Sequence, residues 1–150
     1  MQPLFDVLGR KTWTVGDQPA HANLVKILGN YLIACSIEGM AEATTVAEAA
    51  DLDPKLLVDI LTEGLFTGPV YQGYGAMIAA RNYEPVAFKL ALGRKDVELA
   101  LDTARSHRVP LAFGGVLRDL FTEAVAHGQS DQDWVAVTET TRRRAGLDHR

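Results

Sequence analysis

The sequence predicts an all-α fold, and three observations lead to this prediction. The chain has 150 residues, which is the length of one domain. From about residue 17 onward, residues that start and stop helices recur. Between them, apolar residues follow the spacing of helices, and the alternation typical of strands is scarce. We therefore expect about six helices around one long, buried central helix.

The longest predicted helix runs from about Ala20 to Ala50. Asp17 is expected to cap it, with Pro19 in its first turn. A helix of some 30 residues would be ~45 Å long, which is long for a domain of this size. Its apolar residues occupy nearly every side, and a helix that is apolar all round is a buried one. These residues are Leu24, Val25, Ile27, Leu28, Tyr31, Leu32, Ile33, Cys35, Ile37 and Met40.

The boundaries of the shorter helices follow from local signals. Asp53 is expected to cap a helix whose first residue is Pro54, and Gly64 to end it in a left-handed conformation. A third helix is predicted from Pro69 to about Arg81. The remaining three are expected at 88–107 before Pro110, at 111–127 before Gly128, and from a Ser130 cap to just before Gly146.

The first fifteen residues do not fit this scheme. They contain a short helix-like piece, Pro3 to Leu8, and then an alternating stretch, Lys11 to Val15. A single edge strand has no partner in a helical bundle. We therefore expect residues 1–15 to be the end of a preceding domain and residues 16–150 to form the helical domain.

Composition and charge exclude several classes of partner. The net charge is −4 and the pI about 5.5, so there is no electrostatic basis for binding nucleic acid or an anionic membrane. Cys35 is the only cysteine, which excludes an internal disulfide and fits a reducing compartment. Met1 to Arg10 does not resemble a signal peptide, and the apolar run from Tyr31 to Ile37 is too short to span a bilayer. We expect a cytoplasmic protein.

Familiar catalytic and binding motifs are missing from the sequence. The four histidines have no metal-ligand spacing with Cys35 or with a pair of carboxylates, so no metal site is expected. The chain has neither a phosphate-binding Walker loop nor a G-x-G-x-x-G motif after a strand. It therefore carries no dinucleotide-binding unit of its own.

Two groups of polar residues are unusual for their positions. Lys26 and Asn30 are four residues apart and share one face of the apolar first helix. Phe88 and Lys95 fall on one side of a later helix, with Asp96 about a quarter-turn away. Both groups also have a purely structural explanation: Lys26 reaches to water beside a kink at Asn30, and Lys95 pairs with Asp96 in solvent next to a packed Phe88.

Two sequence blocks carry a resemblance to a known family. The segment GDQPAHANLVKILGNYLIACSIEGMAEATTVAEAADLD resembles the start of the C-terminal domain of β-hydroxyacid dehydrogenases, such as 3-hydroxyisobutyrate dehydrogenase and relatives of 6-phosphogluconate dehydrogenase. The family motif places a lysine four residues before an asparagine, here Lys26 and Asn30, followed by a run such as IEGMAEA. The segment FKLALGRKDVELAL resembles the family's Phe-…-Lys-Asp-…-Leu-Ala helix. The similarity covers about residues 16 to 145, and MQPLFDVLG resembles the end of the family's preceding Rossmann domain.

The resemblance implies hydride transfer between NAD or NADP, bound mainly by a separate N-terminal domain, and a small hydroxy acid or carbonyl substrate. In that family Lys26 would be the catalytic acid–base, and Asn30 would hold the substrate or orient Lys26. Phe88, Lys95 and Asp96 would line the cofactor side of the cleft, with Asp96 orienting Lys95. The resemblance also implies a homodimer formed through the long helix, and a chain that is inactive without the nucleotide-binding half.

Two alternatives remain open from the sequence. The chain could be a stand-alone helical dimerisation module with a vestigial active site, because the long apolar helix needs more cover than five short helices readily provide. It could also be half of an enzyme like the imine reductases, although these usually replace the lysine found here at Lys26. Stabilisation by NADH or NADPH separates an enzyme from a module without catalysis.

Overall fold

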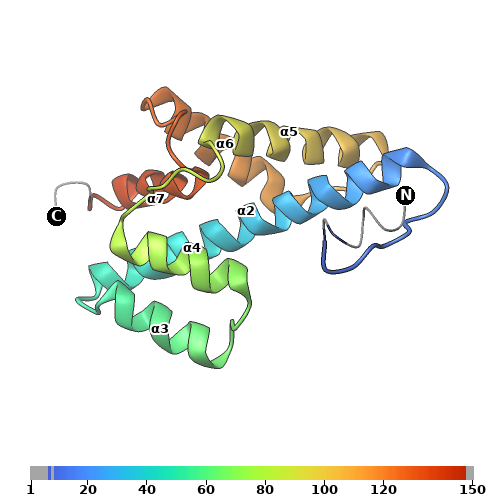
Figure 1. The fold of residues 1–150 in the computed structure, drawn as a ribbon. Helices are drawn as coiled ribbons and strands as arrows, with labels where there is room; N and C mark the ends of the chain where they lie inside the picture. The colour runs from blue at the N-terminus through green and yellow to red at the C-terminus, as the bar shows by residue number, and fades with distance from the viewer. Residues whose placement is uncertain (1–6, 8, 148–150) are drawn as a thin grey trace.

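Helices account for most of the chain in the computed structural model, which describes residue 7 and residues 9–147 (Figure 1). Within these residues the only β-type pairing is one isolated bridge between Lys89 and Asp133. The elements are α2 (Pro19–Ala49), α3 (Pro54–Gly64), α4 (Pro69–Ala80), α5 (Leu90–Ser106), α6 (Ala112–Ala126), the 3-10 helix η1 (Trp134–Val137) and α7 (Thr138–Arg144). The predicted all-α fold is therefore confirmed.

The long helix α2 is the central element of the fold. Its 31 residues pack against α3 and α4 on one side and against α5, α6 and α7 on the other (Figure 1). By length and composition α2 would be able to cross a membrane, with 28% of the relevant window buried in the structure. Because helices α3 to α7 all pack on it, we interpret α2 as the core helix of the bundle.

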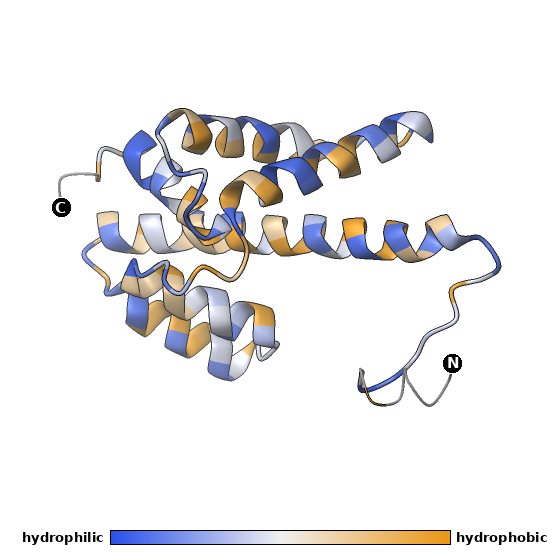
Figure 2. Ribbon diagram, turned by 45° about the horizontal axis from the view of Figure 1, so that its top comes forward, coloured by the Kyte–Doolittle hydropathy of each residue, from blue (hydrophilic) through white to orange (hydrophobic). Residues whose placement is uncertain are grey.

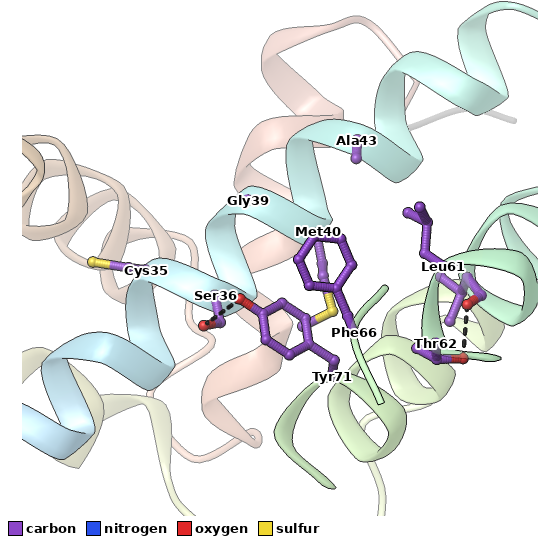
Figure 3. Close-up of a pocket in the computed structure, with 10 residues that line it drawn as sticks. Cys35, Ser36, Gly39, Met40, Ala43, Leu61, Thr62, Phe66 and Tyr71 are labelled. Atoms are coloured by element: carbon purple, nitrogen blue, oxygen red, sulfur yellow. Dashed lines mark hydrogen bonds between the residues drawn. The ribbon is translucent and has the colours of Figure 1, made fainter. Parts of the chain in front are cut away.

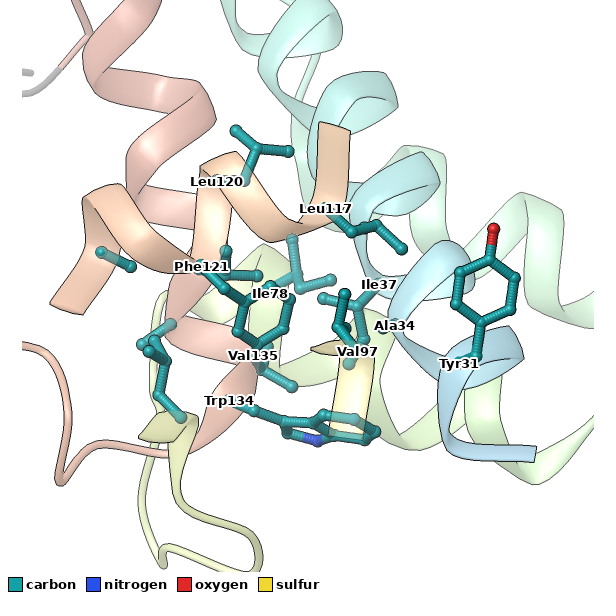
Figure 4. Close-up of a cluster of buried hydrophobic side chains, with 14 of the residues drawn as sticks. Tyr31, Ala34, Ile37, Ile78, Val97, Leu117, Leu120, Phe121, Trp134 and Val135 are labelled. Carbon is teal, nitrogen blue, oxygen red and sulfur yellow. The ribbon is translucent and has the colours of Figure 1, made fainter. Parts of the chain in front are cut away.

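The core forms where α2, α5, α6 and η1 meet (Figure 4). Ile37 of α2, Val97 of α5 and Phe121 of α6 are almost fully buried there. Gly93 lets α5 approach closely, since a Cβ atom at this position would lie 2.9 Å from both the Phe121 ring and the Trp134 ring. The tight packing at Gly93 holds α5 close to α6 and η1.

Within this chain α2 is not buried on all sides. Val25, Leu32 and Val46 are 59%, 63% and 68% exposed. Apolar residues recur along the whole length of α2 (Figure 2). The helices that follow α2 in the sequence thus cover only part of its apolar surface.

The predicted helix caps are confirmed at one position and wrong at two. Asp53 caps α3, and its side chain accepts a hydrogen bond from the Lys55 N–H at 2.9 Å. Asp17 does not cap α2: Gln18 occupies the cap position and makes no side-chain capping bond. Ser130 does not cap the last helical segment either, because Asp133 caps η1 by accepting from the Val135 N–H.

The predicted helix ends lie close to the observed ones, with one difference in conformation. Gly64 is the last residue of α3 and has no positive φ, and the residue after it is right-handed. Left-handed conformations instead occur at Arg81 after α4 and at Gly128 and Gly146 after α6 and α7. Arg81 thus stops α4 in the way expected of a glycine.

The predicted N-terminal elements are only partly within the described residues. The stretch Lys11 to Val15 is not a strand in the structure. The helix-like piece Pro3 to Leu8 lies outside the described residues except for Val7. The division into residues 1–15 and 16–150 stays a prediction.

Candidate functional site

The structure brings Lys26 and Asn30 of α2 together with Asp96 of α5. The Lys26 Nζ atom lies 2.8 Å from Asp96 Oδ2, and the Asn30 side-chain amide donates to the same oxygen at 2.6 Å. Lys26 and Asn30 are one helical turn apart, so both can reach a single acceptor on the neighbouring helix. One carboxylate oxygen therefore joins two predicted site residues across the contact between α2 and α5.

The two charges of this ion pair lie in different environments. The Asp96 side chain is 2% exposed, whereas the Lys26 side chain is 56% exposed. Burial alone would raise the pKa of Asp96, but hydrogen bonds from Lys26 and Asn30 and the charges of Lys26 and Lys95 hold this pKa below its usual range. The carboxylate thus stays ionised inside the protein and anchors an ammonium group that solvent can reach.

Asp96 has a different neighbour from the one predicted. The expectation that Asp96 orients Lys95 is wrong, because its hydrogen bonds come from Lys26 and Asn30. Lys95 is exposed and acts on Asp96 only through its charge. The second oxygen of Asp96, Oδ1, is buried and has no hydrogen-bond partner among the described residues.

Phe88 lies just before α5, against η1. Its half-buried ring meets the ring of Trp134 edge-on, with the centroids 4.9 Å apart. The main chain of Phe88 is also fixed, since its carbonyl accepts from the Trp134 N–H at 2.8 Å. The structure therefore divides the predicted group of Phe88, Lys95 and Asp96 among three environments.

Sequence reasoning missed two interactions. The pairing of Lys26 with Asp96 was missed, although a signal for it existed: Asp96 shares the buried face of its helix with Leu90, Gly93 and Val97. A carboxylate on a buried helix face requires hydrogen-bond partners from another element. The hydrogen bonds from the Ala87 and Phe88 N–H groups, just before α5, to the Asp133 carboxylate were missed as well.

An apolar cavity of about 320 Å³ lies elsewhere, between α2 and α3 (Figure 3). The rings of Phe66 and Tyr71 stack at its edge with centroids 4.7 Å apart, and Ser36 donates to the Tyr71 hydroxyl at 3.3 Å. None of the predicted site residues lines this cavity. Among the described residues, no group of three or more His, Cys, Asp or Glu side chains is placed to hold a metal ion.

The site can supply a charged hydrogen-bond donor at a fixed place. An ammonium group held from behind by a buried carboxylate can stabilise negative charge that develops on a substrate oxygen and can donate a proton to it. Asn30 sits one turn away and keeps an amide oxygen that can accept a further hydrogen bond. A lysine held in this way could serve as an acid–base group.

Comparison with known proteins shows which family of proteins this chain is similar to. The family model described as NAD-binding of NADP-dependent 3-hydroxyisobutyrate dehydrogenase matches residues 20–141. The uncharacterised oxidoreductase YfjR of Bacillus subtilis is 34% identical over 91% of this chain and 47% of its own length. The 2-hydroxy-3-oxopropionate reductase of Escherichia coli is 29% identical over 93% of this chain and 47% of its own length.

The fold is also found in a solved structure. The 3-hydroxyisobutyrate dehydrogenase of Salmonella typhimurium superposes with a TM-score of 0.85, at 24% identity, over 92% of this chain and 48% of that chain. The match to the family model over residues 20–141, together with the helical fold shared with this solved structure, identifies the family of the chain. The chain belongs to the 3-hydroxyisobutyrate dehydrogenase family of β-hydroxyacid dehydrogenases. It spans about half the length of the curated relatives that it matches.

Proposed function

We propose that this chain is the helical C-terminal half of an NAD(P)-dependent oxidoreductase that acts on a small hydroxy acid or carbonyl substrate. In this proposal the chain supplies the catalytic lysine, Lys26, and the dimer interface. The observation that carries the proposal is the cluster of Lys26, Asn30 and Asp96 across α2 and α5. Membership of the family supports the reaction class.

The cluster supports a catalytic role better than a purely structural one. A lysine that only reached for solvent would not need a buried anchor, and Asp96 is almost fully buried. Removing a carboxylate from water is costly unless charged and polar partners compensate it. Here Lys26 and Asn30 provide that compensation, and the ammonium group still faces outward.

Lys26 acts as the acid in the direction of carbonyl reduction. A nicotinamide cofactor supplies the hydride when it is bound. As negative charge grows on the substrate oxygen, the Lys26 ammonium stabilises that charge and transfers a proton from Nζ to the oxygen. In the direction of oxidation the same step runs in reverse, and Nζ takes the hydroxyl proton. Asp96 is a positioning residue in both directions, because it holds Nζ in place.

The remaining predicted residues fit the cofactor only in part. Lys95 offers an exposed positive charge and Phe88 a half-buried ring, which suit a phosphate or ribose group and an apolar wall. The sequence has no G-x-G-x-x-G motif after a strand to hold a dinucleotide. We therefore propose that the nucleotide is held mostly by another domain and that this chain completes the nicotinamide side of the site.

The dimer part of the proposal rests on the exposed apolar residues of α2. Val25, Leu28 and Leu32 are 59%, 40% and 63% exposed and follow one another at helical spacing. Obligate homodimers bury more than about 2,000 Å² of accessible surface in total. A second copy of the chain would supply that cover. Sedimentation showing a stable monomer of 16.3 kDa at micromolar concentration would exclude this arrangement.

The activity test compares the chain alone with the chain joined to a nucleotide-binding half from a relative. Oxidation of NADPH or NADH is followed with 2-hydroxy-3-oxopropionate, the substrate named for one relative, as the probe. The joined protein is expected to turn over, whereas the chain alone is expected to show no turnover because it lacks a phosphate-binding glycine loop. Turnover by the chain alone, or none by a folded joined protein, would contradict the proposal.

A further inference from the structure

Asp133 is the most deeply buried charged side chain of the segment that leads into η1. It is 0% exposed, and its carboxylate accepts hydrogen bonds from two separate parts of the chain. Oδ1 accepts from the Val135 N–H at 3.2 Å, as the cap of η1. Oδ2 accepts from the N–H groups of Ala87 and Phe88 at 2.9 and 3.1 Å. The cap therefore needs only one of the two oxygens.

The segment around Asp133 also holds residues 87–91 through the main chain. The Trp134 N–H donates to the Phe88 carbonyl at 2.8 Å, and the Leu90 N–H donates to the Gln132 carbonyl at 2.9 Å. Lys89 forms an isolated bridge with Asp133. The residues before α5 are therefore shaped by a segment more than 40 positions further along the chain.

The position of the Phe88 ring depends on these contacts. Its backbone N–H bonds to Asp133 Oδ2, its carbonyl bonds to the Trp134 N–H, and its ring packs edge-on against the Trp134 ring. With both backbone polar groups fixed, only the side-chain torsions of Phe88 are left to vary, and the Trp134 ring restricts these. A buried carboxylate that accepts from two consecutive amides fixes the backbone between them more strongly than a single bond would.

We propose that Asp133 is a positioning residue that holds the ring of Phe88 in the place where it forms the wall of the nicotinamide pocket. The inference rests on the proposed function for the role of Phe88, whereas the positioning of the ring by Asp133 is a property of this chain alone. Asp133 itself touches neither substrate nor cofactor in this proposal. It acts through Phe88.

The variants separate the two hydrogen-bonding tasks of Asp133. Asp133→Ser keeps one oxygen that can cap η1 but cannot reach Ala87 and Phe88 at the same time. Asp133→Asn keeps the size of the side chain and one acceptor oxygen, so it serves as the second variant if the serine variant fails to fold. Asp131→Ser is the matched control, because Asp131 lies two residues earlier, is 87% exposed in its side chain and pairs with Lys89 of the same segment.

The first readout is the indole N–H resonance of Trp134 in the isotopically labelled chain. The chain has two tryptophans, and Trp13, which is 72% exposed, provides an internal reference. Phe88→Ala removes the neighbouring ring and shifts the Trp134 signal. Asp133→Ser is expected to shift this signal in the same direction. In the Phe88→Ala background, Asp133→Ser should cause little further shift. Asp131→Ser should leave the signal in place. An undiminished effect of Asp133→Ser in the Phe88→Ala background would overturn the proposal.

The second readout is kinetic, in the protein that joins this chain to a nucleotide-binding half. Asp133→Ser and Phe88→Ala are each expected to raise the KM for the nicotinamide cofactor about fivefold with little change in kcat, and the double variant to be no worse than Phe88→Ala. If Phe88→Ala raises the KM and Asp133→Ser does not, the inference about Asp133 is wrong. If Phe88→Ala itself leaves the KM unchanged while the two residues remain coupled in the indole signal, the proposed cofactor role of Phe88 is wrong, and with it the functional part of this inference.

Discussion

Glu38 gives the fold a stability that depends on pH, and the structure sets both the sign and the size of the effect. The side chain is 7% exposed and lies between α2 and α7. Oε1 accepts from the Thr141 hydroxyl at 2.7 Å, while Oε2 is buried and has no hydrogen-bond partner among the described residues. Burial raises the pKa of Glu38 from 4.5 to about 7; the Thr141 hydrogen bond and Arg144 lower it, and Glu42 raises it.

The sign follows from the difference between the folded and unfolded states. Because the folded state has the higher pKa, it binds the proton of Glu38 more tightly than the unfolded state does. The contribution of Glu38 to stability is therefore fully present below pH 4.5 and is lost as the pH rises through about 7. This difference between the pKa values of Glu38 in the two states corresponds to a loss of about 3 kcal/mol in the free energy of unfolding between pH 4.5 and about 7.

The test is Glu38→Gln, which carries no charge at any pH and keeps an oxygen that can accept from Thr141. The variant is expected to match the natural chain near pH 4.5 and to exceed its free energy of unfolding by up to about 3 kcal/mol at pH 8. Urea unfolding followed by circular dichroism at a series of pH values measures the difference. Glu42→Gln, one turn further along α2 and exposed, is the control and should change little. Parallel curves for the natural chain and Glu38→Gln would refute the reasoning.

Three further predictions concern packing, capping and assembly. Gly93→Ala should destabilise the fold by about 1–3 kcal/mol, because the added methyl group would press on two buried aromatic rings. Gly29 has open space around it, so Gly29→Ala should stabilise α2 by up to about 1 kcal/mol. Thermal unfolding measures both changes. Asp53→Ala should cost about 1 kcal/mol through the lost cap of α3, while Asp17→Ala should cost nothing measurable; equal losses would contradict the capping geometry. Leu32→Glu should shift the sedimentation of the proposed dimer towards monomer without loss of helix content, and an unchanged dimer would exclude this face of α2 from the interface.

Local signals in the sequence were enough to predict the helices and most of their ends. The failure at Asp17 has a simple cause: Pro19 is the first helical residue, so the cap position falls on the residue directly before it, Gln18. Asp53 stands directly before Pro54, and there the prediction is confirmed. A capping residue directly before a proline thus predicts the start of a helix better than either residue alone.

The burial of α2 was harder to predict because hydropathy does not tell which molecule covers a surface. The pattern correctly marked α2 as the apolar central helix, but much of that apolar surface is exposed in this chain, as at Val25 and Val46. Periodicity describes the faces of one helix. Which of these faces meets another helix depends on the packing of the whole fold.

The candidate site was predicted as a set of residues but not as an arrangement. Spacing placed Lys26 and Asn30 on one face of a helix, which the structure shows. Asp96 lies 70 positions from Lys26, so their pairing depends on how α5 packs on α2. Spacing within one helix suggested Lys95 as the partner of Asp96 and could not show the neighbour across the interface.

Replacement of Lys26 tests the central claim most directly. In the protein that joins this chain to a nucleotide-binding half, Lys26→Ala should lower kcat by a factor of about 100 or more, the usual effect of removing a positioned acid–base group. The KM for the cofactor should change little if, as proposed, the nucleotide is held mostly by the other half. Lys55→Ala, which removes an exposed lysine paired with Asp59 on α3, is the matched control and should leave turnover intact. Near-normal turnover of a folded Lys26→Ala protein would show that Lys26 is not the catalytic acid, whereas a loss confined to Lys26→Ala is the result that the account predicts.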